Sequence, residues 1–277
     1  MLEGMGDADL DDVGVGLPEV ELEALDIGPS GVVGLLTCGP DSEKTLRKIA
    51  RRLGKDWWIA LEWGEEPMSG GWARAREEGA RAWPHMEPGR IKRADGSIAE
   101  GISPSGAPRG DRFILVNDAR LESGDDSYGV IRELAKRLGA LGDALDKPLV
   151  DEPRVQMKIV GRTDALLACF PGEGAEYRCH YDGGAGDARK LTAILYVNDW
   201  RPEHGGKLMM YDAGNFDPDS SGPPERCWRT VTPRAGRLVL FRSDRVLHKV
   251  APAFAMRYAL TMFYAARYGK DKRSATN

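Results

Sequence analysis

The chain has 277 residues, of which 42% are apolar, so it is large enough to bury a sizeable core. Its formal net charge of −4 hides an asymmetry, because residues 1–43 contain eleven acidic residues and no lysine or arginine. The remainder therefore has 39 basic and 32 acidic residues (43 − 11), a surplus of 7 that is typical of an ordinary solvated surface. This composition does not favour a nucleic-acid partner.

The four cysteines form neither a C-x-x-C pair nor the dense pattern of a small secreted domain, so we expect them to be reduced. Cys169 and Cys179 are interpreted as small buried residues rather than redox sensors. The sequence does not begin with a secretory signal, and no apolar run approaches the roughly 18 residues of a membrane helix. We therefore expect a monomer in the cytoplasm or nucleus, without membrane contact.

Residues 1–27 are acidic and lack aromatic residues, which predicts a mobile or loosely docked arm before a single domain at 28–277. Apolar residues at helical spacing predict helices over Asp41–Gly54 and Tyr128–Leu145. The intervening segment Glu87–Arg109 is rich in glycine, proline and serine, so it is predicted to be a mobile loop.

After Pro153 the sequence changes to short runs rich in Val, Leu, Ile, Thr and Tyr, separated by turn residues. This pattern predicts an antiparallel β-sandwich with supporting helices, a mainly β fold of the α+β kind. Asp212–Glu225 is predicted to be an exposed insertion. The predicted strands are Val155–Val160, Asp164–Phe170, Lys190–Asn198, Lys207–Tyr211, Arg237–Arg242 and Arg257–Ala265.

His180 and Asp182 are separated by one residue, so on an extended strand both side chains leave the same face. His248 lies far downstream, just after a predicted strand, and would complete a set of two histidines and one carboxylate. Such a facial triad leaves adjacent coordination positions open and suits non-haem iron(II). An H-x-D pair alone often occurs by chance, so a further residue has to support this interpretation.

Arg257 gives that support, because it begins the predicted strand RYALTMFYAA nine residues after His248. A guanidinium there can bind a carboxylate through two hydrogen bonds. By the period of two, Thr261 and Phe263 share the face of Arg257, so these three side chains are expected to line one cavity. The alternative is a surface arginine on an edge strand.

These residues belong to a stretch that resembles the catalytic core of the oxygen-sensing (HIF-type) prolyl 4-hydroxylases, which are iron(II)- and 2-oxoglutarate-dependent dioxygenases. The resemblance covers roughly residues 160–268 and is carried by ACFPGEGAEYRCHYDGGAGDARKLTAILYVNDW, GGKLMMYD and GRLVLFRSDRVLHKVAPAFAMRYALTMFY. A weaker likeness in RGDRFILVND extends it to about residue 109. The resemblance implies a double-stranded β-helix, a jelly-roll or cupin-like core, at about residues 153–268.

By this resemblance, His180, Asp182 and His248 would bind iron(II). Arg257 would bind the distal carboxylate of 2-oxoglutarate, assisted by the hydroxyls of Tyr196 and Thr261. Arginine at this position resembles the oxygen-sensing branch, because the collagen-type enzymes of the secretory pathway have lysine there. Dioxygen would be the second cosubstrate, and ascorbate would act as a reductant.

The resemblance also implies substrate contacts from Arg189, Phe263 and Tyr177, and a salt bridge between Arg189 and Asp111. The alternative for that pair is two unrelated surface charges. Glu87–Pro108 would correspond to the family's mobile loop over the bound peptide.

The sequence departs from the family pattern at two positions. Phe263 replaces a tryptophan beside the substrate proline, and Phe170 replaces a tyrosine, which removes one hydrogen bond near the cosubstrate. These changes put cosubstrate affinity and peptide choice in doubt.

The expected reaction is hydroxylation of a prolyl residue in a protein substrate, with succinate and carbon dioxide as co-products. One alternative is a 2-oxoglutarate oxygenase that acts on another residue type or on a small molecule, which would have a closed pocket without a peptide loop. A second alternative is a non-catalytic jelly-roll module that binds a ligand or protein. An intact triad together with Arg257 favours the enzyme, because a binding module does not need all four residues.

Overall fold

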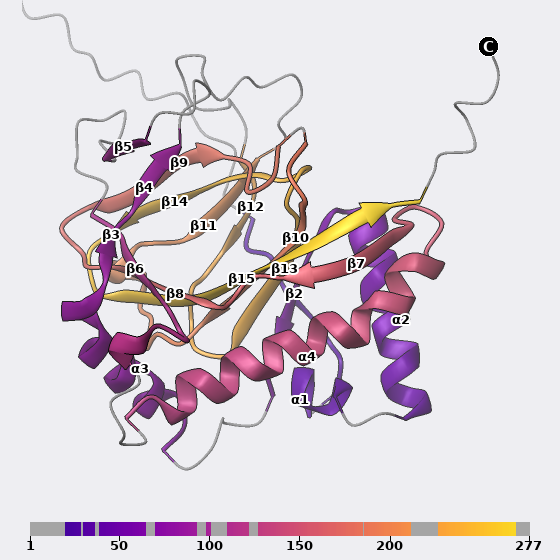
Figure 1. The fold of residues 1–277 in the computed structure, drawn as a ribbon, viewed down its shortest axis with the longest axis horizontal. Coiled ribbons are helices and arrows are strands. Elements are labelled where there is room, and N and C mark those ends of the chain that lie inside the picture. The colour runs from indigo at the N-terminus through magenta and orange to yellow at the C-terminus, as the bar shows by residue number, and fades with distance from the viewer. Residues whose placement is uncertain are drawn as a thin grey trace, which may run out of the picture.

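Two facing β-sheets and a layer of helices make up the fold in a computed structural model of the chain (Figure 1). The structure describes residues 20–269 except 29, 37–38, 65–69, 93–97, 101–109, 122–126, 185 and 212–226. The predicted insertion at Asp212–Glu225 and the first part of the predicted arm therefore lie outside the described residues. Within the described part of the chain, no helix is long and apolar enough to cross a membrane.

The larger sheet has nine strands, and all its pairings except that of β1 with β2 are antiparallel. Strand β7 pairs with β15 beside the main path. In spatial order the strands of the main path, followed by β7, are β1 (Ala24–Leu25), β2 (Trp58–Glu62), β13 (Arg237–Arg242), β10 (Arg189–Tyr196), β15 (Arg257–Tyr268), β8 (Leu166–Phe170), β6 (Arg112–Leu115), β3 (Glu87–Pro88) and β7 (Met157–Arg162).

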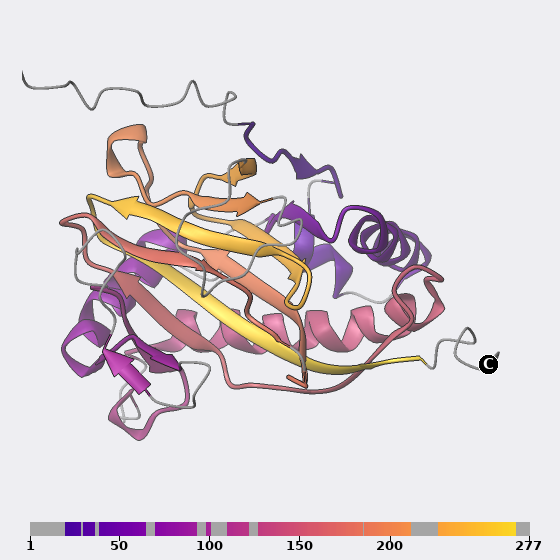
Figure 2. The same ribbon diagram turned by 90° about the horizontal axis from the view of Figure 1, so that it is seen from above.

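The smaller sheet has four antiparallel strands and faces the larger one (Figure 2). Its strands in order are β12 (Cys227–Val231), β11 (Leu208–Tyr211), β14 (Leu247–Ala253) and β9 (Ala175–His180). Within the segment Glu87–Arg109, which was predicted to be a mobile loop, β4 (Arg90–Lys92) and β5 (Ile98–Glu100) pair as a separate antiparallel sheet.

The helices cover the face of the larger sheet that points away from the smaller one (Figure 2). The α-helices are α1 (Gly31–Leu35), α2 (Pro40–Lys55), α3 (Gly71–Ala82) and α4 (Gly129–Asp151), and the short 3-10 helices are η1 (Trp83–His85), η2 (Ala119–Leu121) and η3 (Pro202–His204). The buried carboxylate of Glu78 in α3 accepts hydrogen bonds from the backbone N–H groups of Val130 and Ile131. This contact caps α4, because the first N–H groups of a helix have no partner within it.

Strand β10 separates the two parts of the core. Leu191, Ala193 and Leu195 pack under the helices, whereas Ile194 and Tyr196 point into the space between the sheets. Both faces of the strand are therefore buried, which explains its nearly continuous apolar sequence. The space between the sheets is where the candidate site residues of β10 point.

The described end of the acidic segment is docked rather than free. Leu22 is buried between the sheets, and its carbonyl oxygen accepts a hydrogen bond from Arg237. The carboxylate of Glu21 accepts hydrogen bonds from the Thr230 hydroxyl and from the backbone of Thr232. The predicted arm is thus held against the sheets from about residue 20 onward.

The predicted antiparallel sandwich with supporting helices is confirmed, and its arrangement is a double-stranded β-helix. Both predicted helices are present as α2 and α4, although α4 continues through Pro148 to Asp151. The six predicted strands correspond to β7, β8, β10, β11, β13 and β15 with shifted ends, except that β13 has the predicted bounds. Helix α3 and strands β2, β12 and β14 were not predicted.

Candidate metal centre

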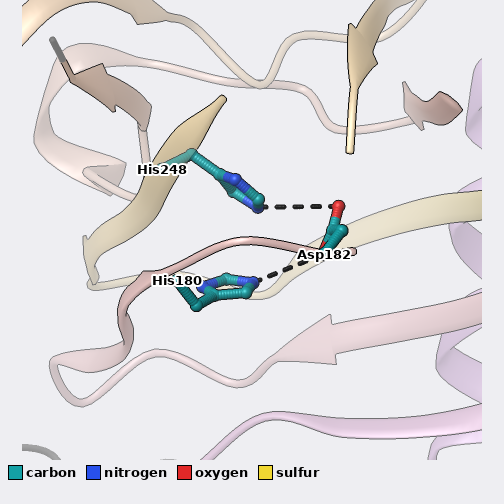
Figure 3. Close-up of side chains that lie close together, drawn as sticks. All are labelled: His180, Asp182 and His248. Carbon is teal, nitrogen blue, oxygen red and sulfur yellow. Dashed lines mark ion pairs between the residues drawn. The ribbon is translucent and has the colours of Figure 1, made fainter. Parts of the chain in front are cut away.

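His180, Asp182 and His248 converge between the two sheets (Figure 3). His180 ends β9, His248 lies near the start of the neighbouring strand β14, and the two residues are direct cross-strand partners. Asp182 follows two residues after His180. Its carboxylate oxygens lie 3.4 Å from Nε2 of His180 and 3.7 Å from Nε2 of His248. The three residues of the predicted triad therefore lie together, and His248 follows β13 as predicted, within the next strand, β14.

Backbone carbonyls orient both imidazoles. Nδ1 of His180 lies 2.8 Å from the carbonyl oxygen of Arg178, and Nδ1 of His248 lies 3.1 Å from that of Val246. A carbonyl can only accept, so each Nδ1 carries the proton and each Nε2 presents a lone pair to the centre of the triad. The Tyr177 ring stacks on His180 with a centroid separation of 3.9 Å. The rings are thus held in orientations that suit metal binding.

The electrostatics of the triad match the needs of a cation site. Burial would raise the pKa of the Asp182 carboxyl, but His248, His180 and the hydroxyl of Thr192 outweigh it and lower that pKa to about 2. Burial and the nearby His180 lower the pKa of His248 to about 4, against the opposing effect of Asp182. At neutral pH the triad therefore offers a carboxylate and a neutral His248, which is the protonation state that metal binding requires.

The donor set fits a first-row divalent metal such as iron(II). Two imidazole nitrogens and one carboxylate oxygen lie within 4.8 Å of one another, so small side-chain movements bring all three to a common ion. Three ligands of this kind on one side of a metal leave adjacent positions for small ligands.

Arg257 is a buried cation on the same side of the larger sheet. Its residue exposure is 5%, and burial lowers its pKa. Its Nε donates to the carbonyl oxygen of Gly206 at 2.7 Å, and its guanidinium lies 4.9 Å from the ring centre of Tyr196 and 5.0 Å from that of Phe170. Among the described residues no carboxylate lies within 4.0 Å of it. A buried charge without a paired anion is costly, so this site favours a carboxylate from a ligand.

Tyr196 supplies a second polar group at this place. Its hydroxyl is buried and has no hydrogen bond with normal geometry among the described residues, although Arg257 lies beside it. Buried hydroxyls without partners are rare in native proteins, so this one also indicates a place for a ligand atom. Thr261 lies on the face of β15 that holds Arg257, because the alternate residues Tyr258 and Leu260 pack under the helices.

Arg189, Phe263 and Tyr177 lie around the exposed side of the triad. The guanidinium carbon of Arg189 lies 5.2 Å from the ring centre of Phe263. The hydrogen bond with Asp187 has the largest effect in raising the pKa of Arg189, and the nearby Asp182 and Tyr177 raise it further. The side chain of Arg189 is 42% exposed. These three predicted substrate residues therefore lie together beside the triad.

The predicted salt bridge between Arg189 and Asp111 does not form. Arg189 is instead paired with Asp187, with a shortest N–O distance of 2.6 Å. The strand register explains the error, because Arg189 pairs with Ala265 near one end of β15, whereas Asp111 precedes β6 near the other end. By this register Asp111 is level with Arg257, so it is separated from Arg189 by eight positions along β15 (265 − 257), or roughly 26 Å. Asp111 lies instead near Arg257 and Cys169.

Two buried hydroxyls behind Asp182 were not predicted. Thr192 donates to Oδ2 of Asp182 at 2.9 Å, and its oxygen lies 2.8 Å from the Ser243 hydroxyl. The alternation of β10 could have indicated Thr192, because it is the polar residue on the face of Tyr196. No sequence signal indicates Ser243, which approaches through the pairing of β10 with β13.

Comparisons with known proteins agree with this geometry. Residues 165–265 match the model of the 2OG-Fe(II) oxygenase superfamily. The chain is 40% identical over 120 residues to Egl nine homolog 1 of Homo sapiens, covering 42% of this chain but 25% of that protein. It is 34% identical over 161 residues to prolyl hydroxylase EGLN3 of Mus musculus, covering 56% and 58%. The chain thus spans a quarter to somewhat more than half of these relatives.

Solved structures show the same fold. A prolyl hydroxylase from Trichoplax adhaerens, in complex with a hypoxia inducible factor peptide fragment, superposes with a TM-score of 0.60 at 23% identity. That match covers 83% of this chain and 94% of the other. A Pseudomonas putida prolyl-4-hydroxylase gives a TM-score of 0.55 at 24% identity, with 80% and 99% covered.

Proposed function

We propose that the protein is a 2-oxoglutarate-dependent dioxygenase that hydroxylates a prolyl residue at C4 in a protein substrate, and the match of residues 165–265 to the 2OG-Fe(II) oxygenase superfamily supports this proposal. The observation that carries the proposal is the pairing of an assembled His180, Asp182 and His248 triad with a buried Arg257 that has no carboxylate partner among the described residues. A metal-binding module without cosubstrate has no need for this second feature.

In this proposal, His180, Asp182 and His248 hold iron(II). Arg257 binds the distal carboxylate of 2-oxoglutarate through its two Nη groups, since its Nε is engaged by Gly206. When bound, iron supplies the oxidative chemistry in which dioxygen and 2-oxoglutarate are converted with the substrate into hydroxylated product, succinate and carbon dioxide.

The remaining cosubstrate contacts come from two hydroxyls. Tyr196 donates its otherwise unpartnered hydroxyl to the same carboxylate, and Thr261 lies on the same strand face as Arg257. Thr192 contacts Asp182 and shares a face of β10 with Tyr196, so the triad and the proposed anchor lie along the same strand between the sheets.

The residues on the exposed side of the triad support a macromolecular substrate. Arg189, Phe263 and Tyr177 surround the exposed side of the triad, and an aromatic ring with a neighbouring cation suits an apolar residue such as proline within a peptide. The names of the relatives identify prolyl hydroxylases, including a hypoxia-inducible factor prolyl hydroxylase of Caenorhabditis elegans. By this likeness we infer that the reaction is prolyl hydroxylation and that the protein has an oxygen-sensing role.

The test is succinate formation from 2-oxoglutarate by the iron(II)-loaded protein, with ascorbate as reductant and a panel of proline-containing peptides. The matched variants are His180→Ala for the metal and Arg257→Ala for the cosubstrate. Turnover that one peptide stimulates and both variants abolish would support the proposal, and mass spectrometry of the peptide would locate the added oxygen.

Other outcomes separate the alternatives. Turnover stimulated by a small molecule but by no peptide would favour a small-molecule oxygenase. A wild-type protein that binds neither metal nor 2-oxoglutarate would rule out the dioxygenase and leave a non-catalytic binding module.

A further inference from the structure

A pair of buried hydroxyls supports the carboxylate of the triad from behind. Thr192 in β10 and Ser243, just after β13, are both fully buried. Thr192 Oγ1 lies 2.9 Å from Oδ2 of Asp182 and 2.8 Å from Oγ of Ser243. The backbone of Ser243 is fixed as well, because its N–H donates to Lys190 and its carbonyl accepts from Gly183.

The direction of these hydrogen bonds follows from the number of protons. A carboxylate can only accept, and Thr192 has one hydroxyl proton, which it donates to Asp182. Only the lone pairs of Thr192 then remain for Ser243, so the Ser243 hydroxyl must donate to Thr192. The hydrogen bonds run from Ser243 through Thr192 to Asp182, and such a chain strengthens each bond in it.

The two oxygens of Asp182 are therefore not equivalent. Oδ2 accepts the hydrogen bond from Thr192 and lies 3.7 Å from Nε2 of His248, whereas Oδ1 lies 3.4 Å from Nε2 of His180 and accepts no hydroxyl hydrogen bond from the described residues. We propose that Thr192 and Ser243 are positioning residues that keep Oδ2 in this hydrogen bond, so that Asp182 binds the metal through Oδ1 alone. This inference rests on the proposed function, since it concerns the metal of that site.

Binding through one oxygen has a consequence for the cosubstrate. Two histidines and one carboxylate oxygen leave three adjacent positions on a six-coordinate metal, and 2-oxoglutarate needs two of them. If Asp182 swung to bind through both oxygens, it would occupy one of these positions and compete with 2-oxoglutarate. Loss of the Thr192 hydroxyl should thus weaken cosubstrate binding even though no ligand of metal or cosubstrate has been removed.

The test uses cobalt(II) in place of iron, because the visible absorption of cobalt reports its coordination. Thr192→Val removes the hydroxyl at nearly constant shape, and Thr192→Ser restores it. Thr230→Val is the matched control, because Thr230 is also fully buried and donates to a carboxylate, that of Glu21, away from the metal. Circular dichroism checks the fold of each variant, and calorimetry measures binding of cobalt and then of 2-oxoglutarate.

For Thr192→Val we expect an altered cobalt spectrum and a loss of about tenfold in 2-oxoglutarate affinity, the scale of other supporting contacts to metal ligands. Thr192→Ser and Thr230→Val should match the wild type. Ser243→Ala, which leaves Thr192 in place, should show a smaller but measurable loss, and it serves as the probe if Thr192→Val does not fold.

Wild-type spectra and affinities in both Thr192→Val and Ser243→Ala would overturn the positioning role, as would the same loss in Thr230→Val. These results differ from failure of the proposed function. In that case the cobalt-loaded wild type itself would not bind 2-oxoglutarate.

Discussion

Replacement of Arg257 by lysine isolates the geometry of the cosubstrate anchor from its charge. The guanidinium donates from Nε to the carbonyl oxygen of Gly206 and has two Nη groups left for a ligand carboxylate. Lysine keeps the positive charge but has three donors on one nitrogen, so it cannot satisfy that carbonyl and both carboxylate oxygens in one plane.

The expected loss is about one hydrogen bond to a charged group, worth about 1.5 to 3 kcal/mol. At about 1.4 kcal/mol for each tenfold change, this corresponds to roughly 10- to 150-fold weaker binding of 2-oxoglutarate. Because the distal carboxylate does not react, its contacts are equally strong before and during the chemical step. Arg257→Lys should therefore raise KM for 2-oxoglutarate and leave kcat nearly unchanged.

Titration of 2-oxoglutarate into manganese-loaded protein measures the affinity without a peptide, and succinate formation then separates KM from kcat. Arg242→Lys is the matched control, because Arg242 is also a buried arginine and donates to the Tyr268 hydroxyl at 3.1 Å, at the opposite end of β15 from Arg257. An Arg257→Lys variant with wild-type affinity, or with reduced kcat at unchanged KM, would refute the role of Arg257 as a bidentate anchor.

Three further predictions use single positions. Burial raises the pKa of the Cys169 thiol to about 12, so at pH 8 only about one molecule in 10⁴ has the thiolate, and iodoacetamide should leave Cys169 unmodified by mass spectrometry until the protein is unfolded. Modification in the folded protein would contradict its burial. A Cβ at Gly142 would lie 2.2 Å from the ring of the fully buried Tyr264, so Gly142→Ala should lower the free energy of unfolding in urea by about 1–3 kcal/mol, and an unchanged midpoint would count against this packing. A Cβ at Gly183 would lie 2.3 Å from the carbonyl oxygen of Arg189, so Gly183→Ala should displace Asp182 and weaken manganese binding by at least about tenfold. Wild-type affinity would contradict this prediction and would mean that the backbone can shift to accommodate the Cβ.

The sequence allowed His180 and Asp182 to be paired as candidate metal ligands because their signal is local. His180 and Asp182 are separated by one residue, and the period of two along a strand placed Arg257 and Thr261 on one face without any knowledge of the partner strands. The same reasoning identified α2 and α4, whose apolar residues recur at helical spacing. Patterns within one strand or helix were therefore enough to predict the residues that this one element positions.

Features that depend on contacts between distant segments were missed or wrongly predicted. Helix α3 contains a single large apolar residue and is held by tertiary contacts, such as those of the buried Glu78 with the start of α4 and of Gly79 with Tyr258. The pairing of Asp111 with Arg189 was wrong because the register that separates them is set by β6, β8, β10 and β15 together. The spacing of residues along the sequence does not reveal the register of these strands.

The exposure of the candidate site residues predicts an order of binding. The side chains of His180, Asp182 and His248 are 18%, 11% and 4% exposed, and Arg257 is buried as well. Arg189, Phe263 and Tyr177 stand at the open end, where a peptide would cover the triad. A dicarboxylate that must reach Arg257 is therefore expected to enter before the peptide. Incubation with a stimulating peptide should slow the association of 2-oxoglutarate in stopped-flow measurements, whereas 2-oxoglutarate should not slow that of the peptide; equal rates in either order would mean a second route to Arg257.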